Sequence, residues 1–112
     1  MGGQLTDWND VSAMREIAAA GPRSLAAQDW VYRTYSRSVS KLAGVLVGRA
    51  VRTEDIEDFL QDTFIKAFAD AKSYRAEAGL RTYLFRILSN SVWDALRHNK
   101  RFPDFSIDDE DA

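Results

Sequence analysis

The sequence predicts an all-α fold, and two observations lead to that prediction. Apolar residues recur at intervals of three and four along most of the chain, which is the spacing of one face of an α-helix. The alternation of apolar and polar residues that is typical of β-strands is missing, and there is no internal repeat. We therefore expect a bundle of three main helices preceded by a short N-terminal helix.

The first two helices are expected before residue 48. A short one begins near Trp8 and ends at Gly21 and Pro22, where Gly would supply the C-cap and Pro cannot continue the turn. A longer one, residues 24–47, follows. Its apolar residues recur at threes and fours and would bury one stripe: Val31, Tyr35, Val39, Leu42 and Leu46. Trp30, Tyr32 and Tyr35 could form a base-stacking cluster, but aromatic residues at helical spacing more often belong to the core.

The third helix, residues 54–71, begins after a predicted N-cap at Thr53. Several carboxylates in its first turns would interact favourably with the exposed N–H groups and the helix dipole. Its apolar face carries Ile56, Phe59, Leu60, Phe64, Ala67 and Phe68. Its outer face carries Asp58, Gln61, Asp62 and Ile65. Such a face is usually only solvated, and as a docking surface it would suit a basic, partly apolar partner.

A loop at residues 72–79 leads to the last helix, which has two chemically different faces. In the loop, Tyr74 and Arg75 are the residues able to stack on or clamp a base. One face of the helix carries Leu84, Ile87, Leu88, Ser91 and Ala95, and the other carries Arg86, Asn90, Asp94, Arg97 and Arg101. Arg and Asn suit phosphates and base edges. The alternative is a solvated outer face, which is common in helical bundles.

Charge is segregated along the chain although the net charge is only −2. Residues 72–103 contain seven basic and two acidic residues, for a net charge of +5, whereas residues 104–112 carry −5. A local cationic surface is therefore available to an anion such as DNA. Pro103 ends the helical part, so we expect one domain at 1–103 and an acidic tail or linker at 104–112.

Composition argues against several other classes of protein. The chain has no Cys and one His, so disulfides and thiolate metal sites are excluded, and we expect no cofactor and no metal. No apolar run is long enough to span a membrane, and no signal peptide is present, so a cytoplasmic location is the default. An enzyme is disfavoured because no nucleophile motif occurs and Asp58 and Asp62 have no recognisable catalytic partner.

Two motifs in order carry a resemblance to a known family. EDIEDFLQDTFIKAF contains an acidic D-x-x-Q-D-T-F helix, and SYRAEAGLRTYLFRILSNSVWDALR continues through L-R-T-aromatic-L-aromatic-R-I to N-x-x-x-D-A-L-R. Residues 25–101 resemble the second domain of an extracytoplasmic-function (ECF, group IV) sigma factor of bacterial RNA polymerase, in the sigma-70 family. The family commonly has Trp where this chain has Tyr83.

The resemblance implies two partners, core RNA polymerase and promoter DNA. The acidic helix would bind the clamp helices of the β′ subunit through Asp58, Gln61, Asp62 and Ile65. The last helix and the loop before it would recognise and open the minus-ten element on its non-template strand. The residues implied in DNA binding are Tyr74, Arg75, Arg81, Tyr83, Arg86, Asn90, Asp94, Arg97, Lys100 and Arg101.

The chemistry of these side chains fits such roles. Opening a duplex costs a few kcal/mol per base step, so the protein must offer a pocket and stacking partners, for which residues 73–77 are placed. Tyr83 would stack at the upstream edge of the opened region. Asn90 and Asp94 would contact base edges, and because Asp94 only accepts hydrogen bonds, the amino group of a cytosine suits it. The arginines and lysines would hold phosphates, which makes binding salt-dependent.

The resemblance also implies a further DNA-binding domain for the minus-thirty-five element, for which this sequence has no residues. The chain is then either a fragment or a protein reduced to one domain, and the acidic tail, which resembles the start of a linker, favours a fragment. An anti-sigma protein is compatible with exposed apolar residues such as Ile65 and Trp93. The alternative function is a helical protein–protein adaptor with no role at DNA. For that adaptor, charge reversal at Arg97 or Arg101 would change no activity.

Overall fold

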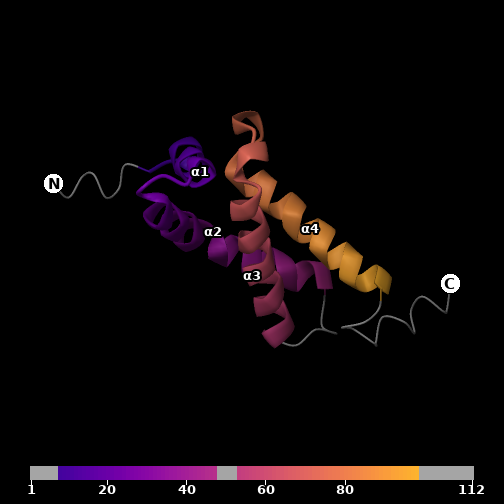
Figure 1. Ribbon diagram of the computed structural model, residues 1–112. Coiled ribbons are helices and arrows are strands. Elements are labelled where there is room, and N and C mark those ends of the chain that lie inside the picture. The colour runs from indigo at the N-terminus through magenta and orange to yellow at the C-terminus, as the bar shows by residue number, and fades with distance from the viewer. Residues whose placement is uncertain (1–7, 48–52, 99–112) are drawn as a thin grey trace, which may run out of the picture.

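The computed structural model describes residues 8–47 and 53–98, and the regular elements in those ranges are all helices (Figure 1). The α-helices are α1 (Asp10–Ala19), α2 (Ser24–Val47), α3 (Thr53–Ala69) and α4 (Leu80–His98). Two short 3₁₀ turns, η3 (Ala71–Ser73) and η4 (Ala76–Ala78), connect α3 to α4. The predicted all-helical bundle, with a short helix before three longer ones, is confirmed, and the expected loop at 72–79 contains these two turns.

The N-terminus of α1 is fixed by a reciprocal capping box. Asn9 Oδ1 accepts a hydrogen bond from the Ser12 backbone N–H at 2.9 Å, and the Asn9 N–H donates to Ser12 Oγ at 2.9 Å. Two N–H groups that lack a partner inside the helix are thereby satisfied. The helix therefore begins where a local side-chain pair can close its first turn.

The C-terminus of α1 differs from the prediction. The left-handed residue is Ala20, with φ of 52°, so the prediction that Gly21 supplies this conformation is wrong. Gly21 instead donates its N–H to the Glu16 carbonyl oxygen at 3.1 Å. A Cβ atom at Gly21 would meet the Glu16 carboxylate, whose Oε2 accepts the Arg23 backbone N–H at 2.8 Å. Glycine is needed here for close approach and not for a left-handed backbone.

The core lies where α2, α3 and α4 meet, and α1 covers one end of it. Its side chains come from every α-helix: Met14 and Ile17 of α1, Val31 and Val39 of α2, Phe59 and Phe64 of α3, and Leu80, Leu84, Leu88 and Val92 of α4. These residues repeat at three and four along each helix, which is why each helix buries one stripe. Burial of such side chains supplies most of the stability of a small domain.

The aromatic residues of α2 mostly join this packing. The Trp30 and Tyr35 rings are half-buried and meet edge to face, with their centroids 6.4 Å apart. Tyr32 is more exposed, but its ring packs on Phe64 of α3 at a centroid distance of 5.0 Å. Trp30 and Tyr35 therefore pack against the core, as the core interpretation expects, whereas Tyr32 remains exposed.

The α3–α4 connection lies at the end of the molecule where α3 finishes, at the top of Figure 1. Gly79 immediately before α4 has φ of 77°, a conformation that side chains other than glycine rarely adopt. The turn allows α4 to run back along α3 and α2. The loop and the first turns of α4 are thus brought against the end of α3.

Candidate nucleic-acid interface

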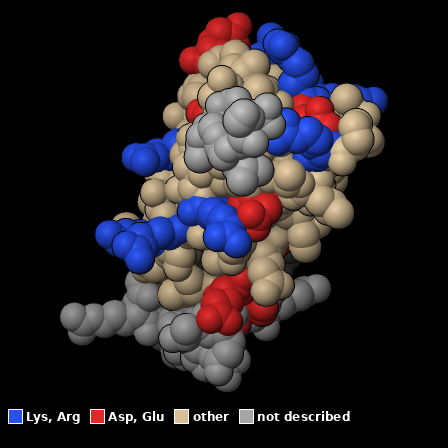
Figure 2. Space-filling view, turned by 90° about the vertical axis from the view of Figure 1, so that its left-hand side faces the viewer, with Lys and Arg blue, Asp and Glu red and all other residues tan. Residues whose placement is uncertain are grey.

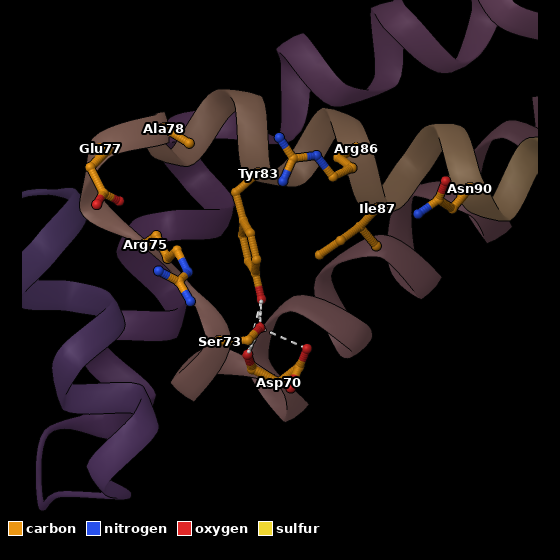
Figure 3. Close-up of a pocket in the computed structure, with 9 residues that line it drawn as sticks. All are labelled: Asp70, Ser73, Arg75, Glu77, Ala78, Tyr83, Arg86, Ile87 and Asn90. Carbon is orange, nitrogen blue, oxygen red and sulfur yellow. Dashed lines mark hydrogen bonds between the residues drawn. The ribbon is translucent and has the colours of Figure 1, made fainter.

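A cavity of about 530 Å³ opens between the connecting loop and the first half of α4 (Figure 3). Ligand sites in proteins typically have volumes of about 300–1,000 Å³. The lining residues come from the end of α3, the loop and α4: Asp70, Ser73, Arg75, Glu77, Ala78, Tyr83, Arg86, Ile87 and Asn90. Four of these, Arg75, Tyr83, Arg86 and Asn90, are residues that the resemblance implies in DNA binding, and Ser73 and Glu77 belong to the segment 73–77 that was expected to supply a pocket. We call this space the loop cavity.

Tyr83 forms a fixed wall of the loop cavity. Its ring points from α4 toward Ser73 and Asp70, and only 9% of the residue is exposed (Figure 3). The hydroxyl donates to the Asp70 carbonyl oxygen at 3.0 Å and lies 3.3 Å from Ser73 Oγ. The hydroxyl, which a Trp would lack, is thus held at the end of α3. That Tyr83 stacks at the upstream edge of the opened region stays a prediction.

Tyr74 lies behind this wall and does not line the loop cavity. Its ring meets Tyr83 edge to face, with centroids 5.3 Å apart, and its other side faces Val11 and Met14 of α1 across a separate small cavity. Burial raises the pKa of the Tyr74 phenol above its ordinary value, and the negative charge of Asp10 raises it further. The structure thus places Tyr74 as support for Tyr83 and not as a second exposed stacking group.

Three arginines along the cavity side of the loop and α4 have no carboxylate partner among the described residues. They are Arg75, Arg86 and Arg97, and all three are exposed. In Figure 3, Arg75 of the loop and Arg86 of α4 lie on opposite sides of the Tyr83 ring. Guanidinium groups that form no ion pair within the protein are available to bind phosphate oxygens.

Asn90 is also available. It is exposed on α4 beside Arg86 and makes no hydrogen bond to any other residue in the described part of the chain. An amide carries both donors and acceptors, so it can read a base edge. Asp94 lies one turn further along and is exposed, but it already takes part in an interaction within the protein.

The remaining predicted DNA-binding residues are not brought to the loop cavity. Arg81 is exposed and is not among the residues that line the loop cavity. Its predicted phosphate contact stays a prediction. Lys100 and Arg101 lie outside the described residues.

The start of α4 is held by a residue that the sequence did not single out. Asp10, the first residue of α1, accepts the Tyr35 hydroxyl at 2.6 Å through Oδ1 and the Leu80 backbone N–H at 3.3 Å through Oδ2. Burial raises the pKa of the Tyr35 phenol, and the hydrogen bond to Asp10 raises it further. One carboxylate thus joins α1, α2 and the first turn of α4 beside the loop cavity.

The outer face of α3 carries the residues predicted to bind polymerase. Asp58, Gln61 and Ile65 are exposed, and Ile65 is 65% exposed although it is apolar. Asp62 is half-buried and differs from the other three, because its Oδ2 accepts a hydrogen bond from Ser91 of α4 at 3.0 Å. Asp62 therefore contributes to the joint between α3 and α4 as well as to the outer face.

Lys66 completes that joint. Its ammonium nitrogen lies 3.0 Å from both Asp62 Oδ2 and Ser91 Oγ. Sequence reasoning missed Lys66, Ser91, Asp70 and Asp10, since each acts through partners that are distant in the chain. Of these four residues, only Ser91 could have been found from the sequence. Its helical spacing placed it on the packed face of the last helix, where a buried hydroxyl needs a hydrogen-bond partner.

Charge is not segregated on every face of the molecule. Figure 2 shows the side on which α1 lies, where basic and acidic side chains alternate in small groups between uncharged atoms. The unpaired arginines instead follow the loop and α4. None of the described helices is long and apolar enough to cross a bilayer.

Comparisons with known proteins agree with the geometry. The family described as Sigma-70 region 2 matches residues 31–102. The ECF RNA polymerase sigma-E factor of Haemophilus influenzae is 40% identical over 78 residues, covering 69% of this chain and 41% of that protein. The ECF RNA polymerase sigma factor SigM of Mycobacterium tuberculosis is 35% identical over 83 residues, covering 74% of this chain and 41% of its own length.

A third relative, the ECF RNA polymerase sigma-E factor of Escherichia coli, is 34% identical over 64 residues, covering 56% of this chain and 34% of that protein. No solved structure matches significantly. The chain spans about two fifths of the length of the first two relatives. The match to most of the helical part of the chain shows that it belongs to the sigma-70 region 2 family, in its ECF branch.

Proposed function

We propose that this domain binds the β′ clamp helices of core RNA polymerase through α3 and recognises and melts the minus-ten promoter element through the loop and α4. Sigma factors are not enzymes, so the work is done by binding energy alone. The domain would act in the cytoplasm, on a promoter held by polymerase. A further DNA-binding domain for the minus-thirty-five element would belong to the full-length protein.

The observation that carries this proposal is the loop cavity with its unpaired polar groups. A base that leaves the duplex loses stacking and pairing worth a few kcal/mol, which a protein must offset with a pocket. The loop cavity has Tyr83 as an aromatic wall, Asn90 for a base edge, and Arg75 and Arg86 for the phosphates on either side. A helix whose polar face is only solvated does not require an aromatic wall, an amide and two arginines around one cavity.

The polymerase contact is supported by the outer face of α3. Asp58 and Gln61 supply acceptors and Ile65 supplies an exposed apolar surface, a combination that suits a basic and partly apolar coiled coil. This face lies on α3, whereas the loop cavity faces α4. The domain can therefore contact polymerase and an unpaired strand at the same time.

The proposal is tested with two variants that separate the two partners. Asn90→Ala should weaken binding of a single-stranded minus-ten oligonucleotide by about 5- to 100-fold, the range for loss of one specific base contact. It should leave association with core polymerase unchanged in a pull-down assay. Gln61→Ala is the matched amide control on α3 and should leave oligonucleotide binding unchanged.

An adaptor without a role at DNA gives the opposite result. In that case Arg97→Glu would change no activity, and no single-stranded sequence would bind at low salt. Either outcome with a correctly folded protein contradicts the proposed function.

A further inference from the structure

A cavity of about 310 Å³ lies between α1 and the segment that connects α3 to α4. We call it the α1 cavity, and none of its lining residues lines the loop cavity. We propose that the α1 cavity binds a small organic anion with an apolar body, and that the bound anion raises the affinity of the domain for single-stranded DNA. The binding site is independent of the proposed function, and only the effect on DNA rests on that function.

The floor of the α1 cavity is apolar. Val11, Met14 and Ala18 recur at intervals of three and four along α1, so their side chains share one face of the helix. Met14 is only 1% exposed, and Ala71 of the connecting segment is buried as well, so this floor is part of the core. The Tyr74 side chain also lines the cavity. Such a lining favours a ligand with a hydrocarbon body over a fully hydrated ion.

Two cations line the same cavity and are available to a ligand. Arg15 of α1 and Lys72 of the connecting segment are both exposed, and neither forms an ion pair with any described residue. A guanidinium and an ammonium group together offer several N–H donors to one carboxylate. The charged end of the ligand is therefore negative.

The carboxylate of the ligand should point away from the first turn of α1. Asp10 begins that turn, and its negative charge raises the pKa of the Tyr74 phenol, so a second carboxylate near Tyr74 would be repelled. Arg15 lies five residues further along the helix, which is about 7.5 Å along its axis. We expect the carboxylate at Arg15 and Lys72 and the apolar body against Met14 and the Tyr74 ring.

The volume of the cavity limits the size of the ligand. Its 310 Å³ lies at the lower end of the range of about 300–1,000 Å³ that is typical of small-molecule sites. A single ring on a short acidic chain is of a suitable size. Hydrocinnamate, a phenyl ring on a short chain that ends in a carboxylate, has this form and serves as the probe.

Tyr74 connects the α1 cavity to the loop cavity. Its ring meets the Tyr83 ring edge to face, with centroids 5.3 Å apart, and Tyr83 forms a wall of the loop cavity. A ligand packed behind Tyr74 restricts the motion of this pair of rings, so less conformational freedom is lost when DNA binds. The coupling is reciprocal, so the ligand and the DNA each raise the affinity for the other by the same factor.

The first arm of the test measures binding of hydrocinnamate to this chain by NMR. Hydrocinnamate should shift the amide signals of α1 and of residues 71–76 in a saturable way. Hydrocinnamamide has the same shape without the charge. It should bind about 4- to 25-fold more weakly, because it loses two ion pairs that contribute about 2- to 5-fold each at an exposed site.

Variants locate the bound anion. Arg15→Gln and Lys72→Gln should each weaken binding by about 2- to 5-fold, whereas Arg33→Gln, at an exposed arginine of α2, should leave it unchanged. Ala18→Leu fills the floor of the cavity and should abolish saturable binding. Ala19→Leu is its matched control, because Ala19 is exposed and does not line the cavity. Circular dichroism melting checks that each variant is folded.

The second arm measures the affinity of the chain for a single-stranded minus-ten oligonucleotide with and without saturating hydrocinnamate. Sodium chloride at the same concentration controls for ionic strength. Hydrocinnamate should raise the affinity by at least about 5-fold, the lower end of common allosteric couplings. It should have no effect on the affinity of Ala18→Leu.

The outcomes separate the site from its effect. Absence of saturable shifts, equal binding of hydrocinnamate and hydrocinnamamide, or unchanged binding in folded Ala18→Leu would overturn the site. Saturable binding with unchanged oligonucleotide affinity would overturn the effect on DNA. Failure to bind any oligonucleotide without hydrocinnamate would contradict the proposed function instead, since the first arm contains no DNA.

Discussion

Tyr83 shows how a single hydroxyl changes the role of a side chain. The resemblance implied that Tyr83 stacks at the upstream edge of the opened region, and in the structure a hydrogen bond to Asp70 at the end of α3 holds the ring as a wall of the loop cavity. Local sequence could not reveal this, because the acceptor is a backbone carbonyl thirteen residues earlier. In this position, a base could stack on the Tyr83 ring only by entering the loop cavity, of which the ring forms a wall.

We expect Tyr83→Ala to impair promoter opening more than polymerase association. The change should lower the free energy of unfolding by about 3–5 kcal/mol, because it empties a buried aromatic site. Tyr83→Phe keeps the ring and should cost only about 1 kcal/mol, the value of a hydrogen bond. Urea denaturation measures stability, and abortive transcription with the variants grafted into a full-length sigma factor measures opening. Equal loss of opening in both variants would contradict the wall interpretation.

Tyr35 makes a prediction about alkaline pH. Burial and the hydrogen bond to Asp10 raise its pKa, so the folded protein keeps the phenol proton at a pH where the unfolded chain has lost it. The stabilising contribution is complete below the unfolded pKa of 10.0 and declines as the pH rises above it. Tyr74 contributes in the same direction.

We expect the unfolding midpoint in urea to fall between pH 9 and pH 11, about one unit on either side of the ordinary tyrosine pKa. The fall should be shallower in Tyr35→Phe, which has no proton to lose at this site. Tyr32→Phe is the matched control, because Tyr32 is exposed, and it should follow the unchanged protein. Identical slopes for all three proteins would contradict the role of Asp10 and burial.

At the scale of the elements, the helices themselves could be predicted and their contacts could not. The spacing of apolar residues fixed α2 at the predicted bounds and placed α4 with its polar face outward. The left-handed Ala20 was missed because a Gly next to it satisfies the usual C-cap pattern. Asp10 and Lys66 were missed because side-chain hydrogen bonds between helices leave no periodic signal.

Asp10 makes α1 part of the support for the loop cavity. We expect Asp10→Ala to lower the free energy of unfolding by about 1–2 kcal/mol, because the Leu80 N–H and the Tyr35 hydroxyl both lose their acceptor. It should also weaken oligonucleotide binding, since the first turn of α4 is released. Asn9→Ala removes the neighbouring cap of α1 and should cost stability without changing the oligonucleotide affinity of the folded protein. Equal effects on affinity would show that α1 stability alone matters.

Variants of Asp62 and Ser91, which join α3 to α4, can show whether α3 binds polymerase independently of its packing on α4. We expect Asp62→Arg to reduce association with core polymerase, because it reverses charge on the outer face of α3. Ser91→Ala removes the other end of the same hydrogen bond and should cost about 1 kcal/mol of stability with polymerase association unchanged. Pull-down and urea denaturation on both variants separate the two effects. Loss of polymerase association in Ser91→Ala would mean that Asp62 acts by positioning α3.

At the scale of the whole molecule, net charge conceals where binding takes place. The chain carries −2 overall, yet three unpaired arginines follow the loop and α4, while basic and acidic groups alternate on the side of the molecule where α1 lies (Figure 2). The segregation at residues 72–103 could be read from the sequence. Which of those cations are paired depends on the fold.

This arrangement predicts that salt acts on binding through a few identified residues. Each phosphate contact to a single strand contributes a slope of about −0.7 to the plot of log affinity against log salt concentration. Arg86→Ala should therefore make the slope shallower by about 0.7 for a single-stranded minus-ten oligonucleotide. Arg33→Ala, at an exposed arginine of α2, changes the net charge equally and should leave the slope unchanged. Equal slopes for both variants would mean that DNA responds to total charge and not to the unpaired arginines beside the loop cavity.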